Sequence, residues 1–125
     1  MKLIATSLKR FTLAVLTVIF VAGTFAIFTP TASAETVQVK MGADNGMLAF
    51  QPKTVTIEAG DTVEWVNNKL APHNVVVEGH EELSHKQLLM APNASIDSTF
   101  TEPGTYTYWC EPHRGAGMVG KIVVK

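Results

Sequence analysis

The sequence predicts an all-β sandwich with at most one short helix. Two features of residues 35–125 indicate this fold. First, β-branched and aromatic residues recur in short runs where apolar and polar side chains alternate, the period of a strand with one buried face. Second, glycine, proline and asparagine separate these runs at short intervals, as turns do between the strands of a sandwich. One stretch, residues 81–90, departs from this pattern.

The expected strands follow from the alternating runs. In residues 36–41 the side chains of Val37, Val39 and Met41 fall on one face, so this run should form a half-buried strand. Further strands are expected over residues 50–57, 63–67, 74–77, 96–101, 106–110 and 120–125. Turn signals between them lie at residues 44–46, 59–61, 67–68 and 103–104.

Residues 81–90 lack strand alternation and could form one or two helical turns, which Pro92 would close. The stretch is polar and rich in acidic residues. We therefore expect His80 and His85 to be surface residues with no part in the chemistry.

The first 34 residues have the composition of a cleavable export signal. Lys2, Lys9 and Arg10 make the start basic, residues 11–28 are almost entirely apolar, and the triplet Ala32-Ser33-Ala34 provides an A-x-A cleavage site. The apolar run is long for a signal peptide, so an uncleaved membrane anchor is the alternative. Because a helix-breaking proline and the small-residue triplet follow directly, we predict a signal peptide over residues 1–34 and a domain over residues 35–125.

Charge limits the partners of that domain. Removing 34 of the 125 residues leaves 91, with 7 of the 10 basic residues and all 11 acidic residues, a net charge of −4. A mildly acidic surface argues against nucleic acid and against anionic lipid as partners. We expect no stable membrane insertion after cleavage.

The chain's one cysteine, Cys110, is the first indication of a metal site, because a free thiol in an oxidising compartment is a liability unless something occupies it. It begins the pattern C-x2-H-x4-M, which His113 and Met118 complete between two expected strands. Thiolate, imidazole and thioether are soft ligands that suit copper and not magnesium or calcium.

A second imidazole would complete the site, and His73, at the entry to another expected strand, supplies it best. Two histidines and a cysteine in a plane with a weak axial methionine is the blue-copper electron-transfer arrangement. With all four positions filled by protein, no position remains open for a substrate, so we predict an electron-transfer protein and not an enzyme. The backbone N–H of Asn74 is the expected hydrogen-bond donor to the Cys110 sulfur.

Other interpretations of these residues are weaker. Zinc seldom takes a thioether ligand. A nucleophilic pair of Cys110 and His113 would lack a nearby orienting Asn or Asp and would leave Met118 without a role. Asn93 begins a glycosylation sequon, a motif common by chance, which we discount because the signal looks bacterial.

Four segments resemble the cupredoxins, and more narrowly the plastocyanins. They are residues 46–50, 67–74, 100–108 and 110–121, of which the last is the most specific. The resemblance implies a Greek-key β-sandwich with one copper ion near one end. It also implies a monomer that carries electrons from cytochrome f to photosystem I in the thylakoid lumen, here of a cyanobacterium.

The resemblance also implies a docking surface around the exposed edge of His113. Its apolar and small residues would be Gly46, Leu48, Pro72, Pro112 and Ala116, with Arg114 as a charged steering element. Leu48 could instead be a turn residue packed on the core.

The chain departs from the resemblance at two places. Trp109 stands where the family usually has tyrosine or phenylalanine, which leaves the role of this position open. Residues 78–93 form a shorter stretch than in most relatives and lack a long acidic patch, so we expect transfer rates to depend only weakly on ionic strength.

Two rival functions come from other classes. A copper chaperone or storage protein would hold Cu(I) in an exposed, exchangeable site, and an immunoglobulin-like interaction domain would hold no metal. Intense blue absorption that disappears on reduction would separate the electron carrier from both.

Overall fold

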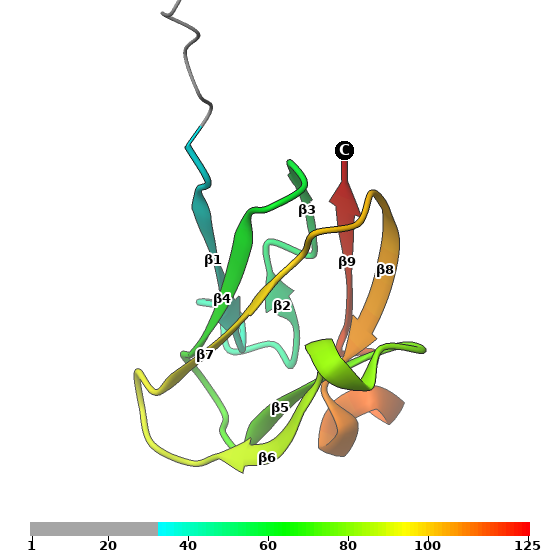
Figure 1. Cartoon of the computed structure of the whole chain (residues 1–125). Coiled ribbons are helices and arrows are strands. Elements are labelled where there is room, and N and C mark those ends of the chain that lie inside the picture. The colour runs from blue at the N-terminus through cyan, green and yellow to red at the C-terminus, as the bar shows by residue number, and fades with distance from the viewer. Residues whose placement is uncertain (1–32) are drawn as a thin grey trace, which may run out of the picture. The chain divides into compact units, whose positions relative to one another are not determined.

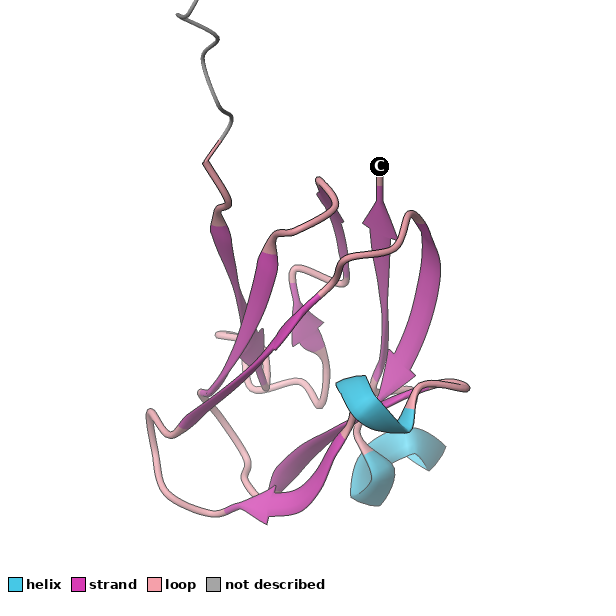
Figure 2. Ribbon diagram, viewed as in Figure 1, coloured by secondary structure: helices cyan, strands magenta, loops and turns pink. Residues whose placement is uncertain are grey.

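The computed structural model describes residues 33–125, which form two β-sheets packed face to face (Figures 1 and 2). The predicted signal peptide lies outside these residues except for Ser33 and Ala34. In chain order the strands are β1 (Thr36–Met41), β2 (Phe50–Gln51), β3 (Thr54–Ile57), β4 (Thr62–Asn67), β5 (His73–Val77), β6 (His85–Leu89), β7 (Ser95–Thr99), β8 (Gly104–Trp109) and β9 (Val119–Val124). The predicted all-β sandwich is confirmed.

The strand order mixes segments that are distant in the chain. One sheet has the order β2-β1-β4-β7 and the other β3-β9-β8-β5-β6. β1 pairs with β4 in parallel, in the register Thr36↔Thr62 through Met41↔Asn67, and β3 pairs with β9 in parallel. The other strand pairs are antiparallel.

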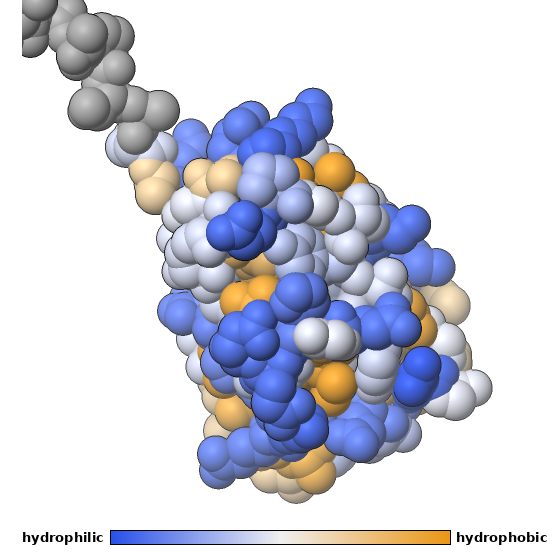
Figure 3. Space-filling view, turned by 45° about the vertical axis from the view of Figure 1, so that its right-hand side comes forward, coloured by the Kyte–Doolittle hydropathy of each residue, from blue (hydrophilic) through white to orange (hydrophobic). Residues whose placement is uncertain are grey.

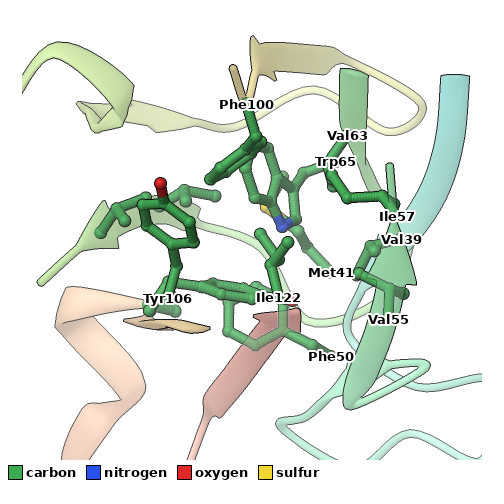
Figure 4. Close-up of a cluster of buried hydrophobic side chains, with 14 of the residues drawn as sticks. Val39, Met41, Phe50, Val55, Ile57, Val63, Trp65, Phe100, Tyr106 and Ile122 are labelled. Atoms are coloured by element: carbon green, nitrogen blue, oxygen red, sulfur yellow. The ribbon is translucent and has the colours of Figure 1, made fainter. Parts of the chain in front are cut away.

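Alternation along the strands builds the core between the sheets. In β4 every second side chain is buried, with Val63 and Trp65 fully covered, and β1 buries Val39 and Met41 in the same way. Aromatic rings fill the centre (Figure 4). The Trp65 and Tyr108 ring centroids are 5.4 Å apart with the rings nearly edge to face, a geometry that adds to the hydrophobic stabilisation of burial.

Tyr108 explains a glycine inside a strand. Gly120 lies opposite Tyr108 in the β8–β9 ladder, and a Cβ atom at residue 120 would come within 2.4 Å of the tyrosine ring. Burial of the phenol raises the pKa of Tyr108 to about 12, so the ring stays neutral.

Residues 81–90 do not continue as a helix. A single 3₁₀ turn, η2 (Glu81–Leu83), is followed at once by β6. Tertiary hydrogen bonds outweigh the weak local preference. Ser84 Oγ accepts from the N–H of Val77 and donates to the carbonyl of His80, which ends the turn.

His85 is partly buried and is more than a plain surface residue. Its Nε2 lies 2.7 Å from the Asp97 carbonyl oxygen and 2.8 Å from Ser98 Oγ, so it joins β6 to β7 across the two sheets. His80 is also partly exposed, with its ring 4.9 Å from that of Tyr106. Within residues 33–125, no helix is long and apolar enough to cross a membrane.

Candidate metal centre

Three of the four predicted ligands converge at the end of the sandwich where β5 begins and β8 ends. His73 is the first residue of β5. Cys110 directly follows β8, and His113 lies in a second 3₁₀ helix, η3 (Glu111–Ala116), which the sequence analysis did not anticipate. The three candidate ligand atoms of His73, Cys110 and His113 all lie within 4.8 Å of one another.

These three side chains face one another through the atoms that bind metals. Cys110 Sγ is 3.6 Å from His73 Nδ1 and 3.5 Å from His113 Nδ1. A nitrogen at roughly 2.1 Å and a sulfur at roughly 2.3 Å from one ion, at about 120° to each other, are about 3.8 Å apart. The observed spacing therefore fits a shared metal ion, and the donor types fit copper.

The His73 ring is held in the tautomer that a metal requires. Its Nε2 donates a hydrogen bond to the Lys69 carbonyl, which leaves the Nδ1 lone pair directed toward the cysteine. The side chain is fully buried, and burial is the main cause that lowers the pKa of His73. A neutral imidazole with a fixed free nitrogen is ready to coordinate.

Cys110 is also fully buried, and burial raises the pKa of its thiol. Hydrogen bonds from the backbone N–H groups of Asn74 and His113 oppose that rise. A metal ion would supply the remaining stabilisation of the thiolate, with release of a proton on binding. The site thus disfavours a free thiolate, whereas a thiolate bound to a metal ion would be stable there.

Backbone hydrogen bonds close the loop of residues 110–118, which carries three of the predicted ligands and is called the ligand loop below. The N–H of Cys110 donates to the Met118 carbonyl, and the N–H of Met118 donates to the His113 carbonyl. Between them Gly117 adopts a left-handed conformation, with φ of 90°, that ends η3. Met118 is fully buried at the end of this loop, as an axial ligand would need to be.

Comparison with known proteins decides the family. Residues 37–125 match the family model described as copper binding proteins, plastocyanin/azurin family. The chain belongs to this family. It is 55% identical to a plastocyanin of Nostoc punctiforme over 100% of this chain and 99% of the relative. It is 46% identical to a plastocyanin of Prochlorothrix hollandica over the whole of both chains.

Solved structures agree with this assignment. The oxidised plastocyanin from Dryopteris crassirhizoma is 30% identical with a TM-score of 0.65, covering 71% of this chain and all of that one. The amicyanin from Paracoccus versutus is 31% identical with a TM-score of 0.57, covering 77% and 85%. The resemblance found in the residues is confirmed, and with it the Greek-key type of sandwich.

Family membership settles the class of function. The protein is a blue-copper electron carrier and not an enzyme, and its cofactor is copper. The metal-free immunoglobulin-like alternative is therefore excluded.

The side chain of Asn74 has a role that the sequence analysis missed. Its Oδ1 accepts a hydrogen bond of 2.8 Å from the N–H of Glu111, and its Nδ2 donates to the Lys86 carbonyl at 3.0 Å. One buried amide thus ties β5 to both the ligand loop and β6. An asparagine directly after a predicted metal ligand was the only available signal.

The residues expected around His113 lie at different depths. Gly46, Pro112, Arg114 and Ala116 are exposed, whereas Leu48 and Pro72 are half-buried. Two larger apolar residues of the same loops, Met47 and Leu70, are 62% and 55% exposed and were not anticipated. Figure 3 shows apolar surface broken into separate patches between polar residues on the face turned forward.

Arg114 is held in place by an aromatic ring. Its guanidinium carbon lies 3.8 Å from the centroid of the Trp109 ring, a cation–π contact. The Trp109 position, whose role was open, therefore supports a charge beside the ligand loop.

Proposed function

We propose that His73, Cys110 and His113 are the strong ligands of one type 1 copper ion and that Met118 is its axial ligand. The support is the mutual spacing of three ligand atoms, 3.5 and 3.6 Å from sulfur to the two nitrogens, around a soft donor set. When bound, the ion supplies the one-electron Cu(I)/Cu(II) couple. Packing around the buried side chains of His73, Cys110 and Met118 would hold the ligands in nearly the same places in both states.

The two histidine ligands would have different roles because they differ in burial. His73 is fully buried, and its second nitrogen is already bonded to Lys69. His113 is only partly buried. The exposed edge of His113 would therefore be the route by which electrons enter and leave, while His73 fixes the ion from inside.

The partners we propose are cytochrome f as electron donor and photosystem I as acceptor, with the protein acting as a monomer in the thylakoid lumen of a cyanobacterium. The plastocyanin names of the full-length relatives support this assignment. Delivery to the lumen would use residues 1–34 as a signal peptide cleaved after Ala34, and a mass spectrum of the mature protein beginning at Glu35 would test the position.

Docking would use the small and apolar residues near His113. Gly46, Leu48, Pro72, Pro112 and Ala116 offer a surface without long interlocking side chains, suited to brief encounters. Met47 and Leu70 would enlarge it. Arg114, steadied by Trp109, would steer the approach of an acidic partner.

The test is single-turnover electron transfer between the reduced copper-loaded protein and a photosystem I preparation. We expect Leu48→Ala to slow the second-order rate roughly tenfold, as loss of an apolar contact at the centre of a docking face would. Arg114→Gln should slow it about twofold to threefold, and less at high salt.

Matched controls lie at the far end of the sandwich. Val37→Ala trims another half-buried apolar residue and Lys125→Gln removes another exposed charge, and neither should change the rate. Equal slowing by Val37→Ala and Leu48→Ala would contradict the docking surface. A copper-loaded protein without blue absorption would contradict the metal site itself.

A further inference from the structure

The carboxylate of Asp61 lies in the turn between β3 and β4, beside the residue that precedes β1. It is nearly buried, and both of its oxygens accept hydrogen bonds. Asp61 is 7% exposed. Its Oδ1 accepts a hydrogen bond of 2.9 Å from the N–H of Glu35, and its Oδ2 accepts one of 2.9 Å from the N–H of Glu58. The carbonyl of Glu35 in turn accepts from the N–H of Thr62 at 2.9 Å. Both backbone groups of residue 35, its N–H and its carbonyl, are therefore hydrogen-bonded to residues 61 and 62.

The turn that carries Asp61 is itself well fixed. The N–H of Asp61 donates to the Glu58 carbonyl, and its own carbonyl accepts from the N–H of Phe100. Gly60 closes the arrangement by donating to the Phe100 carbonyl at 2.7 Å. The hydrogen bond from Glu35, followed by that from Glu58, holds the pKa of Asp61 below its ordinary value. The carboxylate is a rigid anionic receptor aimed at the nitrogen of residue 35.

That nitrogen is the atom that signal cleavage after Ala34 would change. Hydrolysis adds hydroxyl to the Ala34 carbonyl carbon and a proton to the Glu35 nitrogen as the peptide bond breaks. At neutral pH the released acid loses a proton and the amine gains one. One neutral N–H donor thereby becomes an ammonium group with a full positive charge, beside a carboxylate already at 2.9 Å.

We propose that Asp61 is the receptor for the new amino terminus of the mature protein. The inference depends on the cleavage position proposed above but not on the metal site. The resulting ion pair would lock the first residue of the domain onto the β3–β4 turn. It would secure the parallel pairing of β1 with β4, which begins at Thr36↔Thr62.

Charged groups of both signs lie at this end of the sandwich. The titratable groups nearby are the side chains of Glu35 and Glu58 and the C-terminal Lys125, whose carbonyl accepts from the N–H of Ala59. The two glutamates would favour the new ammonium and the Lys125 ammonium would oppose it, so the contact of 2.9 Å with Asp61 is the deciding one. Position matters as well, because one extra residue would move the charge about 3.3 Å along the chain and away from the carboxylate.

The experiment compares copper-loaded proteins exported from the full chain. One has the natural cleavage site, a second carries one extra alanine between Ala34 and Glu35, and a third is the natural form with its α-amino group acetylated. Each is made with Asp61 and with Asp61→Asn. The α-amino pKa is followed by NMR, and unfolding by urea.

In the natural form we expect an α-amino pKa above the ordinary value of about 7.7 to 8.0. Since a raised pKa means that the folded state holds the proton more tightly, the stabilisation should be complete below that range and disappear as pH rises through the folded pKa. At pH 7, Asp61→Asn should raise the unfolding constant about fivefold more in the natural form than in the acetylated or extended forms.

An ordinary α-amino pKa, or the same effect of Asp61→Asn in natural and acetylated proteins, would overturn the proposal. Should Asp61→Asn fail to fold, the pKa and the effect of acetylation in the unsubstituted protein still decide it. A mature protein that begins elsewhere than Glu35 would also overturn it. A protein that shows the raised α-amino pKa but no blue colour with copper would contradict the metal site and leave this proposal standing.

Discussion

The two ends of the sandwich collect polar groups in opposite ways. At the metal end, Sγ of Cys110 and Nδ1 of His73 and His113 face one another with lone pairs turned inward. At the far end, where β1 begins (Figure 1), both oxygens of Asp61 receive backbone N–H donors. The metal end brings together three electron-pair donors that a metal cation can bind. At the far end the backbone supplies hydrogen-bond donors to the carboxylate, and these bonds stabilise the fold.

The largest expected effect is at the metal end. Cys110→Ser removes the soft thiolate, so the copper-loaded variant should lose all intense blue absorption, measured by titration with Cu(II). Asp61→Asn at the far end should leave the colour unchanged. Blue absorption that survives in Cys110→Ser would end the contrast between the two ends.

Asn74→Ala tests how far the metal end depends on hydrogen bonds within the chain. It leaves the N–H of Glu111 and the carbonyl of Lys86 without their partner, which should cost about 1 to 2 kcal/mol in the free energy of unfolding. A looser ligand loop should also shift the reduction potential, measured by redox titration. Gln87→Ala, at an exposed side chain of β6, should change neither quantity.

A pair of glycines in the ligand loop gives a smaller and cleaner contrast. Gly117 has φ of 90°, and a Cβ there would meet no atom within 4 Å, so Gly117→Ala should cost about 1 kcal/mol through the backbone alone. Gly115 is equally open but does not have positive φ, so Gly115→Ala should be close to neutral. Equal effects in urea unfolding would contradict a conformational cost specific to Gly117.

The smallest effect concerns an exposed carboxylate at the metal end. Hydrogen bonds, first from Lys40 and then from Asn68 and Gln51, lower the pKa of Asp44 from about 3.8 to about 2. Because the folded pKa lies below the unfolded one, the contribution of Asp44 is present above pH 3.8 and is lost as pH falls toward 2.

Asp44→Asn should therefore flatten the acid limb of the stability curve in that window, measured by urea unfolding at several pH values. Asp97→Asn, at an exposed side chain of β7, serves as the control. If Asp44→Asn leaves the dependence of stability on pH unchanged, the hydrogen bonds of Asp44 with Lys40 and Asn68 do not contribute to the free energy of unfolding.

Sequence reasoning reached most of the fold through side-chain period. The alternation of Val39 with Met41 and of Val63 with Trp65 identifies buried faces regardless of which strands become neighbours. It did not find β6, because His85–Leu89 is held by bonds from His85 to β7 that lie outside the local pattern. It also missed η3, whose 3₁₀ geometry depends on closure of the loop by Cys110 and Met118.

The sequence by itself determined the chemistry, because C-x2-H-x4-M places three soft donors within nine residues and a preceding Pro-His offers the fourth. Only the tertiary structure decided which histidine is sealed inside, which amide ties the loops together, and where the first residue of the domain meets a carboxylate. Ligand identity is a property of side-chain type and local spacing. Burial, tautomer and ion pairing depend on atoms brought together from segments such as residues 35 and 61, or 74 and 111, which only folding places within hydrogen-bond distance.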